Sequence, residues 1–464
     1  MMTAFDVDLA LAGASDTPFW LDDPRRPAPR PSVNATVSTD LAIVGGGFTG
    51  LWSALLAKER NPQRRVVLVE ANTLGWAASG RNGGFCSASL THGYDNGKKH
   101  LPEEVDKLLE LGIQNLDEIE STIERYHMDC DFERTGEIDL ATKEHHVPGL
   151  KAAHAPEAGL EWVGPEELHS YLRSPVFLGG LRDRRGNAIV NPAKLVWELA
   201  RVASDLGVEI YENTLVTKVS SGPWGVSLHT EQAEVRASKV ILATNVFPSL
   251  VRSLRWHTVP VYDYVLVTEP LSAEQLASIG WENREGLADI GSQFHYFRLT
   301  KDQRILWGGW DAIYHFGRRM SPRFDQRPET FRTLARQFHE AFPQLGQVRF
   351  THAWGGAIDT CSRFFPFFHR SHGGRVLSAA GFTGLGVGAS RFAAQVMLDE
   401  LDDCASERRD LAMVRTKPIP FPPEPIAWLG ITLTTRALIR SDQRGGRRGP
   451  WLKLLDALGM GFDS

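Results

Sequence analysis

Residues 40–50 read DLAIVGGGFTG, and this stretch decides the first part of the fold. The apolar run from Leu41 to Val44 predicts a buried strand, and Gly45, Gly47 and Gly50 follow with the G-x-G-x-x-G spacing at which a helix begins. Gly45 permits a tight turn, Gly47 lets the backbone approach a pyrophosphate, and Gly50 lets the helix pack closely on the strand. Alone, this spacing also fits an ordinary strand-to-helix turn, so the neighbouring sequence has to decide between the two.

The residues that follow complete a strand-helix-strand unit. Apolar residues recur at helical spacing after Gly50, Asn61-Pro62 ends the helix, and Val66–Val69 predict a second strand that leads into Glu70. A carboxylate at that position accepts hydrogen bonds from an adenosine ribose, and an acid there argues against a 2′-phosphate. The unit therefore predicts dinucleotide binding with the phosphates at the helix N-terminus, but it does not separate FAD from NAD.

Composition narrows the class of protein. At 464 residues the chain is long enough for two or three domains, and 42% hydrophobic with 23% charged residues is ordinary for a globular protein. The formal net charge of −5 gives no electrostatic reason to expect nucleic acid. No apolar stretch reaches about 18 residues and the acidic N-terminus does not read as a signal peptide, so we expect no membrane span. Widely spaced cysteines predict a reduced, cytoplasmic protein without a metal site: Cys86, Cys130, Cys361 and Cys404.

Two styles of predicted strand indicate two interleaved domains. Buried segments of the parallel type occur within 40–70, 207–245 and 375–380, whereas alternating segments such as 259–271 and 296–309 favour an antiparallel sheet. The predicted fold class is α/β plus α+β, a Rossmann-like cofactor domain interleaved with an antiparallel-sheet substrate domain. The expected boundaries are an arm at 1–38, a cofactor domain at 39–95, 175–247 and 350–410, a substrate domain at 96–174 and 248–349, and a C-terminal extension at 411–464.

A second glycine-rich loop lies near the end of the predicted cofactor domain. Gly384, Gly386 and Ala389 imitate another fingerprint, but no strand ending in an acid follows, so we do not expect a separate nucleotide site. The helix that begins there still offers its N-terminus to a different anion.

Four motifs in this order carry a resemblance to a known family. They are VGGGFTG with Glu70, GWAASGRNGG (75–84), VILATNVF (240–247) and AAGFTGLGVG (379–388), and they span roughly residues 38–405. The chain resembles the D-amino-acid-oxidase-like family of FAD-dependent amine and amino-acid oxidoreductases. Within it, the branch of glycine and sarcosine oxidases is most similar and, because of residues 79–84, so are the gamma-glutamylputrescine oxidase-like enzymes.

The resemblance implies FAD rather than NAD. It places Glu70 at the adenosine ribose, residues 79–83 along the pyrophosphate and ribityl chain, and residues 384–387 at the flavin pyrimidine edge, where a helix dipole favours negative charge. No histidine lies within 75–80 and Cys361 is poorly placed for attachment, so we expect noncovalent FAD. The implied cofactor residues are Gly45, Gly47, Phe48, Thr49, Gly50, Glu70, Ala71, Ala78, Ser79, Arg81, Asn82, Gly83, Gly84, Val216, Ala243, Thr244, Asn245, Gly355, Gly381, Gly384, Leu385, Gly386 and Val387.

The family's chemistry implies hydride removal from a carbon next to nitrogen, giving an imine that water hydrolyses. The substrate is then an amine, an amino acid or a polyamine derivative, and no nucleophile triad is required. Residues expected near such a substrate are Thr91, His92, Tyr264, Tyr296, Arg298, Trp354 and Arg363. Each also has a structural interpretation: a hydrogen-bonding histidine, core aromatics on strands, or an arginine in an interdomain salt bridge rather than on a substrate carboxylate.

The electron acceptor and two other functions stay open. Some amine-oxidising relatives place a lysine over the flavin, whereas residues 304–307 contain none, which puts oxygen as acceptor in doubt. One alternative is a biosynthetic tailoring flavoenzyme that oxidises a nitrogen-bearing intermediate with another acceptor, and another is a flavin-binding protein without turnover. The Trp428-Leu429 and Trp451-Leu452 pairs suggest that the C-terminal extension packs on the body or on a partner chain. The oligomeric state is not readable from the sequence.

Overall fold

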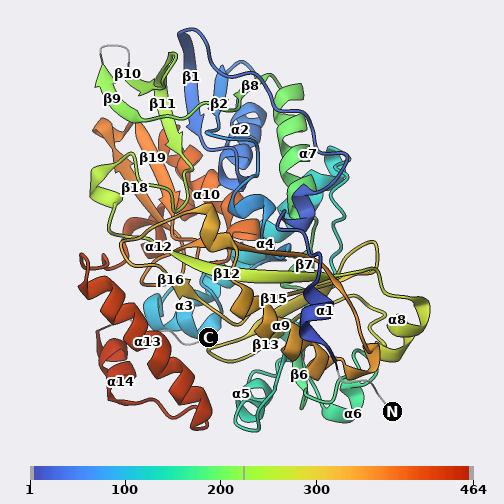
Figure 1. Ribbon diagram of the computed structural model, residues 1–464. Coiled ribbons are helices and arrows are strands. Elements are labelled where there is room, and N and C mark those ends of the chain that lie inside the picture. Colours follow the sequence, from blue (N-terminus) through green and yellow to red (C-terminus); the bar gives the residue numbers. More distant parts are fainter. Residues whose placement is uncertain (1–4, 223–224, 459–464) are drawn as a thin grey trace.

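The computed structural model describes residues 5–222 and 225–458, and two large sheets dominate it (Figure 1). The sheet that contains the predicted dinucleotide-binding unit fills the upper part of the view, and the antiparallel sheet crosses the lower part. The predicted arm and C-terminal extension include residues 1–4 and 459–464, which lie outside the described residues.

The first sheet is mainly parallel, as the buried segments predict. Its strands are β1 (Val37–Val44), β2 (Val66–Val69), β8 (Val208–Tyr211), β9 (Lys218–Gly222), β10 (Gly225–His229), β11 (Glu234–Leu242), β18 (Phe367–Ser371) and β19 (Val376–Ala380). They are ordered β18-β19-β11-β1-β2-β8, and β1 pairs in parallel with both β2 and β11. The antiparallel β9–β10 hairpin continues from β11.

Helices bury one face of this sheet: α2 (Phe48–Arg60), α4 (Val105–Arg125), α7 (Pro192–Asp205) and α10 (Gly386–Leu401). In α4, Leu108, Leu111 and Ile119 recur at helical spacing and join the core that holds Leu41 and Ile43 of β1. This packing corrects the predicted boundary at residue 96, because α4 belongs to the core of the first sheet and not to the substrate domain.

The second sheet has the strands β4 (Glu137–Leu140), β5 (Leu160–Val163), β6 (Gly180–Asp183), β12 (Val259–Thr268), β13 (Gly286–Asp289), β14 (His295–Leu299), β15 (Ile305–Gly309), β16 (Ile313–Tyr314) and β17 (Phe350–Thr360). Their order is β16-β12-β15-β14-β13-β4-β6-β5, with β17 paired to β12. All pairs are antiparallel except β13 with β4. Two more boundaries need correction, since β6 and β17 lie in this sheet although 175–247 and 350–410 were assigned to the cofactor domain.

The remaining elements cover the two sheets. They are α1 (Val7–Leu11), α3 (Tyr94–His100), α5 (Val147–Ala152), α6 (Pro165–Leu168), α8 (Ala273–Ile279), α9 (Pro328–Ala341), α11 (Glu407–Asp410), α12 (Ala412–Arg415), α13 (Ile426–Gln443), α14 (Pro450–Ala457) and the ladder of β3 (Phe85–Ser87) with β7 (Asn187–Ile189). Helix α9 packs on the outer face of the second sheet. Leu452 of the C-terminal extension is buried, while Trp428 and Leu429 stay partly exposed. Within 5–222 and 225–458, no helix combines the length and apolar character that a bilayer crossing requires.

Candidate active site

A cavity of about 1800 Å³ lies between the two sheets. Three loops line one side: the turn between β1 and α2, the segment 75–83, and the turn before α10. We call these loops the glycine cradle. The predicted cofactor residues that line the cavity are Gly45, Gly47, Phe48, Thr49, Glu70, Ala71, Ala78, Ser79, Arg81, Asn82, Gly83, Val216, Ala243, Thr244, Asn245, Gly384, Leu385, Gly386 and Val387. Motifs that lie far apart in the sequence therefore meet around one space.

Four of the predicted cofactor glycines do not line the cavity. A Cβ at Gly50 would collide with the Gly45 carbonyl oxygen, and one at Gly84 would collide with the Val190 carbonyl oxygen. A Cβ at Gly355 would lie 2.8 Å from the Tyr264 ring, and one at Gly381 would lie 2.9 Å from Cys361. These glycines permit the close packing behind the cradle, which is the role that the fingerprint assigns to Gly50.

The first turn of the cradle fits a pyrophosphate. Gly45 has φ +114°, and a side chain there would collide with the Ala243 carbonyl oxygen, so a glycine is required. A Cβ at Gly47 would lie 2.7 Å from Ser79 Oγ, and that oxygen accepts a hydrogen bond from the Phe48 N–H at 3.0 Å. The start of α2 is thus bare backbone beside one hydroxyl group, which leaves space for phosphate oxygens.

Glu70 fastens the loop next to this turn. Its Oε2 accepts the Gly46 N–H at 2.6 Å, and its Oε1 accepts the Asn72 N–H at 2.9 Å and the Trp76 indole N–H at 2.8 Å. Burial raises the pKa of this carboxyl group, while the three donors oppose that rise. Each carboxylate oxygen accepts about two hydrogen bonds, so Oε2 keeps room for a ribose hydroxyl group. The carboxylate fits the predicted ribose contact.

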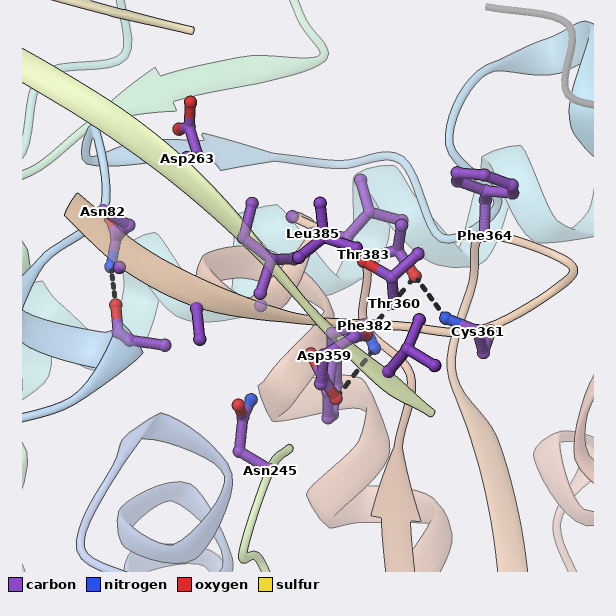
Figure 2. A pocket seen from close by; sticks show the side chains of 18 of the residues that line it. Asn82, Asn245, Asp263, Asp359, Thr360, Cys361, Phe364, Phe382, Thr383 and Leu385 are labelled. Carbon is purple, nitrogen blue, oxygen red and sulfur yellow. Dashed lines mark hydrogen bonds between the residues drawn. The ribbon is translucent and has the colours of Figure 1, made fainter. Parts of the chain in front are cut away.

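A second buried carboxylate, which the predicted site residues do not include, shapes the turn before α10. Asp359 is the penultimate residue of β17, and its Oδ2 accepts the Gly381 N–H at 2.6 Å and the Phe382 N–H at 3.2 Å. Figure 2 shows this hydrogen bonding beside Thr383, which also contacts Cys361. Burial raises the pKa of Asp359 to about 6. The carboxylate fixes the loop so that the N-terminus of α10 faces the cavity.

The other side of the cavity is the inner face of the second sheet, which we call the sheet wall. Paired residues in neighbouring strands share a face, and the register Val265–Gly308–Tyr296–Ala288–Asp139 runs across five strands. In β12, side chains alternate, so Asp263 shares the face of Val265 while Tyr262 and Tyr264 join the outer core. The alternation in VPVYDYVLV is the signal that could have identified Asp263.

Asp263 and Tyr296 form a hydrogen-bonded pair on the sheet wall. The Tyr296 hydroxyl donates to Asp263 Oδ2 at 2.5 Å. The tyrosine ring lies across Gly308, where a Cβ would be 2.5 Å from it. Burial raises the pKa of Asp263 to about 6, although the tyrosine hydrogen bond opposes the rise. The cavity therefore contains a carboxylate whose protonation changes close to neutral pH.

Tyr264 and Trp354, both predicted near the substrate, do not line the cavity. Tyr264 lies on the outer face of β12 and donates its hydroxyl to the Phe324 carbonyl oxygen at 3.0 Å. Trp354 is fully buried and donates its indole N–H to the Arg81 carbonyl oxygen at 2.9 Å. Tyr264 therefore supports the sheet wall from behind, whereas Trp354, which pairs with Val265 on the inner face, packs against the cradle segment 75–83.

The two predicted arginines also lie away from the cavity. Arg298 donates to the carbonyl oxygens of Val190 at 2.7 Å and Gly84 at 3.2 Å, and burial lowers its pKa to about 9. Arg363 donates to the carbonyl oxygens of Pro366 at 2.6 Å and Met413 at 2.8 Å, and burial lowers its pKa to about 10. Carbonyl groups use their donors, so neither side chain is placed to bind a substrate carboxylate.

Of the two predicted substrate residues that follow segment 75–83 of the cradle, His92 lies at the cavity and Thr91 lies in the core. His92 lines the cavity, and burial lowers its pKa, so its imidazole is neutral at pH 7. Thr91 is buried outside the cavity and donates its hydroxyl to the Gly93 carbonyl oxygen at 3.0 Å. Of the seven residues predicted near the substrate, His92 and Tyr296 line the cavity.

Comparison with known proteins shows which family has this architecture. Residues 40–400 match the model of the DAO family, described as FAD dependent oxidoreductase. The chain is 29% identical over 404 residues to gamma-glutamylputrescine oxidoreductase of Escherichia coli, covering 85% of this chain and 90% of that protein. It is 26% identical over 395 residues to the probable oxidoreductase OrdL of Haemophilus influenzae, covering 82% and 87%. Glycine oxidase from Geobacillus kaustophilus has the same fold, with a TM-score of 0.68 at 20% identity, covering 82% of this chain and 99% of that one.

Proposed function

Because the chain belongs to the DAO family of FAD dependent oxidoreductases and is therefore an FAD-dependent enzyme, we propose that it oxidises an amine at the carbon next to nitrogen. The names of similar proteins support this substrate class, among them gamma-glutamylputrescine oxidoreductase and the beta subunit of sarcosine oxidase from Rhodobacter capsulatus. The product is an imine, which water hydrolyses.

The glycine cradle is the proposed FAD site. Gly45, Gly47 and Ser79 would hold the pyrophosphate, Glu70 the ribose, and the N-terminus of α10 the flavin pyrimidine edge. When bound, FAD supplies the two-electron acceptor that amino-acid side chains lack. We propose that it is held without a covalent bond, because burial raises the pKa of Cys361 and that thiol donates to the carbonyl oxygens of Phe365 and Gly381.

The observation that carries the proposal is the Asp263–Tyr296 pair on the sheet wall. A half-buried carboxylate facing a cavity is suited to bind an ammonium group and to accept its proton, which leaves the amine lone pair available for oxidation. The tyrosine hydroxyl orients the carboxylate from one side. Among the described lining residues, the arginines are Arg81, which pairs with Asp325 at 2.5 Å, and Arg252, which lies outside the sheet wall.

A titration without oxygen tests this function. Purified holoprotein is mixed with monoamines, amino acids and polyamines while the visible flavin absorbance is followed. We expect at least one amine to bleach the flavin band, and we expect Asp263→Asn to slow bleaching by roughly 100-fold while retaining flavin. If no compound in the panel bleaches the band, or if Asp263→Asn reacts as fast as the wild type, the proposal is wrong.

We also propose an electron acceptor other than oxygen. Lys218 on β9 is the single lysine among the described residues that line the cavity, and it lies on the first sheet. A cation beside the flavin would stabilise negative charge that develops on oxygen, and the sheet wall supplies none. After anaerobic reduction, we expect colour to return slowly when oxygen is admitted and fast with a quinone dye.

The unpaired cysteines further support a reducing, cytoplasmic location.

A further inference from the structure

The sheet wall carries more carboxylates beyond Tyr296. Asp139 of β4 lies in the register row of Tyr296, and Glu137 lies two residues away on the same face. Asp183 of β6 is paired directly with Glu137. All three line the same cavity as Asp263. We call Glu137, Asp139 and Asp183 the distal carboxylates.

The distal carboxylates lack cationic partners. Glu137 and Asp139 make no side-chain hydrogen bond or ion pair with any residue in 5–222 or 225–458. Both side chains are half-buried and line the cavity. Asp183 accepts the backbone N–H groups of Arg185 and Gly186 at 2.8 and 2.9 Å. Anions that are partly withdrawn from water in this way are costly unless a cation neutralises them.

Nearby arginines are committed to other acids. Arg182 pairs with Glu285 at 3.2 Å, Arg184 pairs with Glu161, and Arg134 pairs with Asp117 and Glu120. Burial and mutual repulsion raise the pKa of Glu137 well above its usual range and that of Asp139 to about 6. Among the described residues no cation compensates these acids, so protonation takes the place of a cation, and a bound cation would favour their charged form.

The geometry favours an organic cation over a metal ion. Among the described residues, no group of three or more acidic, histidine or cysteine side chains is arranged to hold a metal ion. The surroundings are apolar, with Phe85, Leu160, Leu181 and Ala288 lining the same part of the cavity. An alkyl chain that ends in an ammonium group matches both features, because its methylene groups contact the apolar side chains and its charge meets the acids.

We propose that the distal carboxylates bind a second charged nitrogen of the substrate, so that the enzyme acts on a long polyamine whose reacting nitrogen lies at Asp263. This inference rests on the proposed function. From β12 to β4 there are four strand spacings, or about 19 Å between backbones at about 4.8 Å each. Side chains extend inward from both ends, so the two nitrogens would be separated by roughly 10–19 Å.

Two variants and a chain-length series test the inference. The series comprises a monoamine, α,ω-diamines of increasing length and spermine, each used to reduce the holoenzyme without oxygen. In the wild type we expect KM to fall with chain length, and in Glu137→Gln/Asp139→Asn we expect the KM for spermine to rise at least about tenfold with little change for the monoamine. Glu161→Gln, which removes one acid from the same sheet outside the cavity, is the matched control and should behave as the wild type.

Calorimetric binding of spermine to the holoprotein is the second readout, and it does not depend on turnover. Removing two half-buried acids that have no cationic partner among the described residues should not unfold the protein, so the melting temperature of the double variant should be at least that of the wild type. If a monoamine bleaches the flavin but chain length and the double substitution change neither KM nor binding, this inference fails while the amine function stands. If no amine bleaches the flavin, the proposed function fails, and calorimetry alone decides whether the distal carboxylates bind a polyamine.

Discussion

The two sides of the cavity are built in different ways. The glycine cradle presents backbone N–H groups from three turns, and glycine is required at Gly45 because a side chain there would collide with the Ala243 carbonyl oxygen. The sheet wall presents side chains from β12, β14 and β4 that meet only through strand pairing. A site made of backbone groups can be recognised from short, fixed spacings of glycine in the sequence. A site made of strand side chains depends on the pairing register and on which face of the sheet each side chain occupies. This difference separates cofactor binding from substrate choice, so substitutions on the two sides should have different effects.

The largest effect is expected in the cradle. Gly45→Val should abolish FAD retention, because its Cβ would collide with the Ala243 carbonyl oxygen and φ +114° strains any residue with a side chain. The measurement is the ratio of flavin to protein after gel filtration, together with the melting temperature. Gly149→Ala, at a helical glycine with open space around it, is the control and should retain flavin fully. Normal flavin content in Gly45→Val would contradict the assignment of the cradle.

On the sheet wall the next largest effect is the pH dependence of amine oxidation. Burial raises the pKa of Asp263 to about 6, so the carboxylate is protonated below that pH and cannot bind an ammonium group. We expect kcat/KM to rise about tenfold per pH unit up to about pH 6 and then to level, until the amine itself titrates. Asp139 and Asp359 also have pKa values of about 6, so the profile of Asp263→Asn is needed as a reference. If the variant keeps the full acidic limb, another group causes it.

The raised pKa of Asp263 also predicts that this carboxyl group destabilises the fold at high pH, where it favours activity. A carboxyl group whose pKa is raised on folding contributes stability at low pH that is lost as pH rises through about 6. Asp263→Asn should therefore gain thermal stability relative to the wild type at pH 8 and show little gain at about pH 3.5, below the pKa of about 3.9 that an unfolded aspartate has. Scanning calorimetry of both proteins at both pH values measures this difference, and an equal shift at the two pH values would exclude ionisation of Asp263 as its cause.

The sequence predicts the glycine cradle better than it predicts the sheet wall. Spacing predicts the loop 40–50 and Glu70, and the family resemblance implies the segment 75–84 and residues 384–387, because the turns and helix starts that carry both are local in the sequence. The sheet wall is not predicted in this way. The sequence predicts Tyr264 near the substrate as an aromatic residue on an alternating strand, yet its neighbour Asp263 faces the cavity. A shift of one residue along the strand decides whether a side chain lies in the core or in the site.

The arginines illustrate a second limit. Arg298 and Arg363 carry the charge that a substrate carboxylate needs, but their donors are used by carbonyl oxygens of segments distant in sequence. Pairing of that kind cannot be read without the tertiary structure. Domain boundaries at 96, 175 and 350 differ for the same reason, since α4, β6 and β17 join partners that are far along the chain.

Replacing Arg298 tests that structural role. Arg298→Met should lower the free energy of unfolding by about 2–4 kcal/mol, because the Val190 and Gly84 carbonyl oxygens lose charged donors inside the protein. KM for amines should change less than about threefold, since the side chain does not line the cavity. Denaturant unfolding and steady-state kinetics measure the two quantities. A large rise in KM with unchanged stability would return Arg298 to the substrate site.

The smallest effect separates the two faces of the second sheet most directly. Tyr264→Phe and Tyr296→Phe each remove one hydroxyl group from a buried ring, and the two tyrosines differ in the face they occupy. Tyr264→Phe removes a hydrogen bond to the Phe324 carbonyl oxygen behind the wall, so it should cost about 1 kcal/mol of stability and change kcat/KM less than about twofold. Tyr296→Phe leaves Asp263 without its tyrosine donor, which should raise the pKa of that carboxyl group further and move the acidic limb of kcat/KM to higher pH. If Tyr264→Phe moved the limb and Tyr296→Phe did not, β12 and β14 would face the cavity with the opposite phase, and the substrate site proposed for the sheet wall would be on the wrong side.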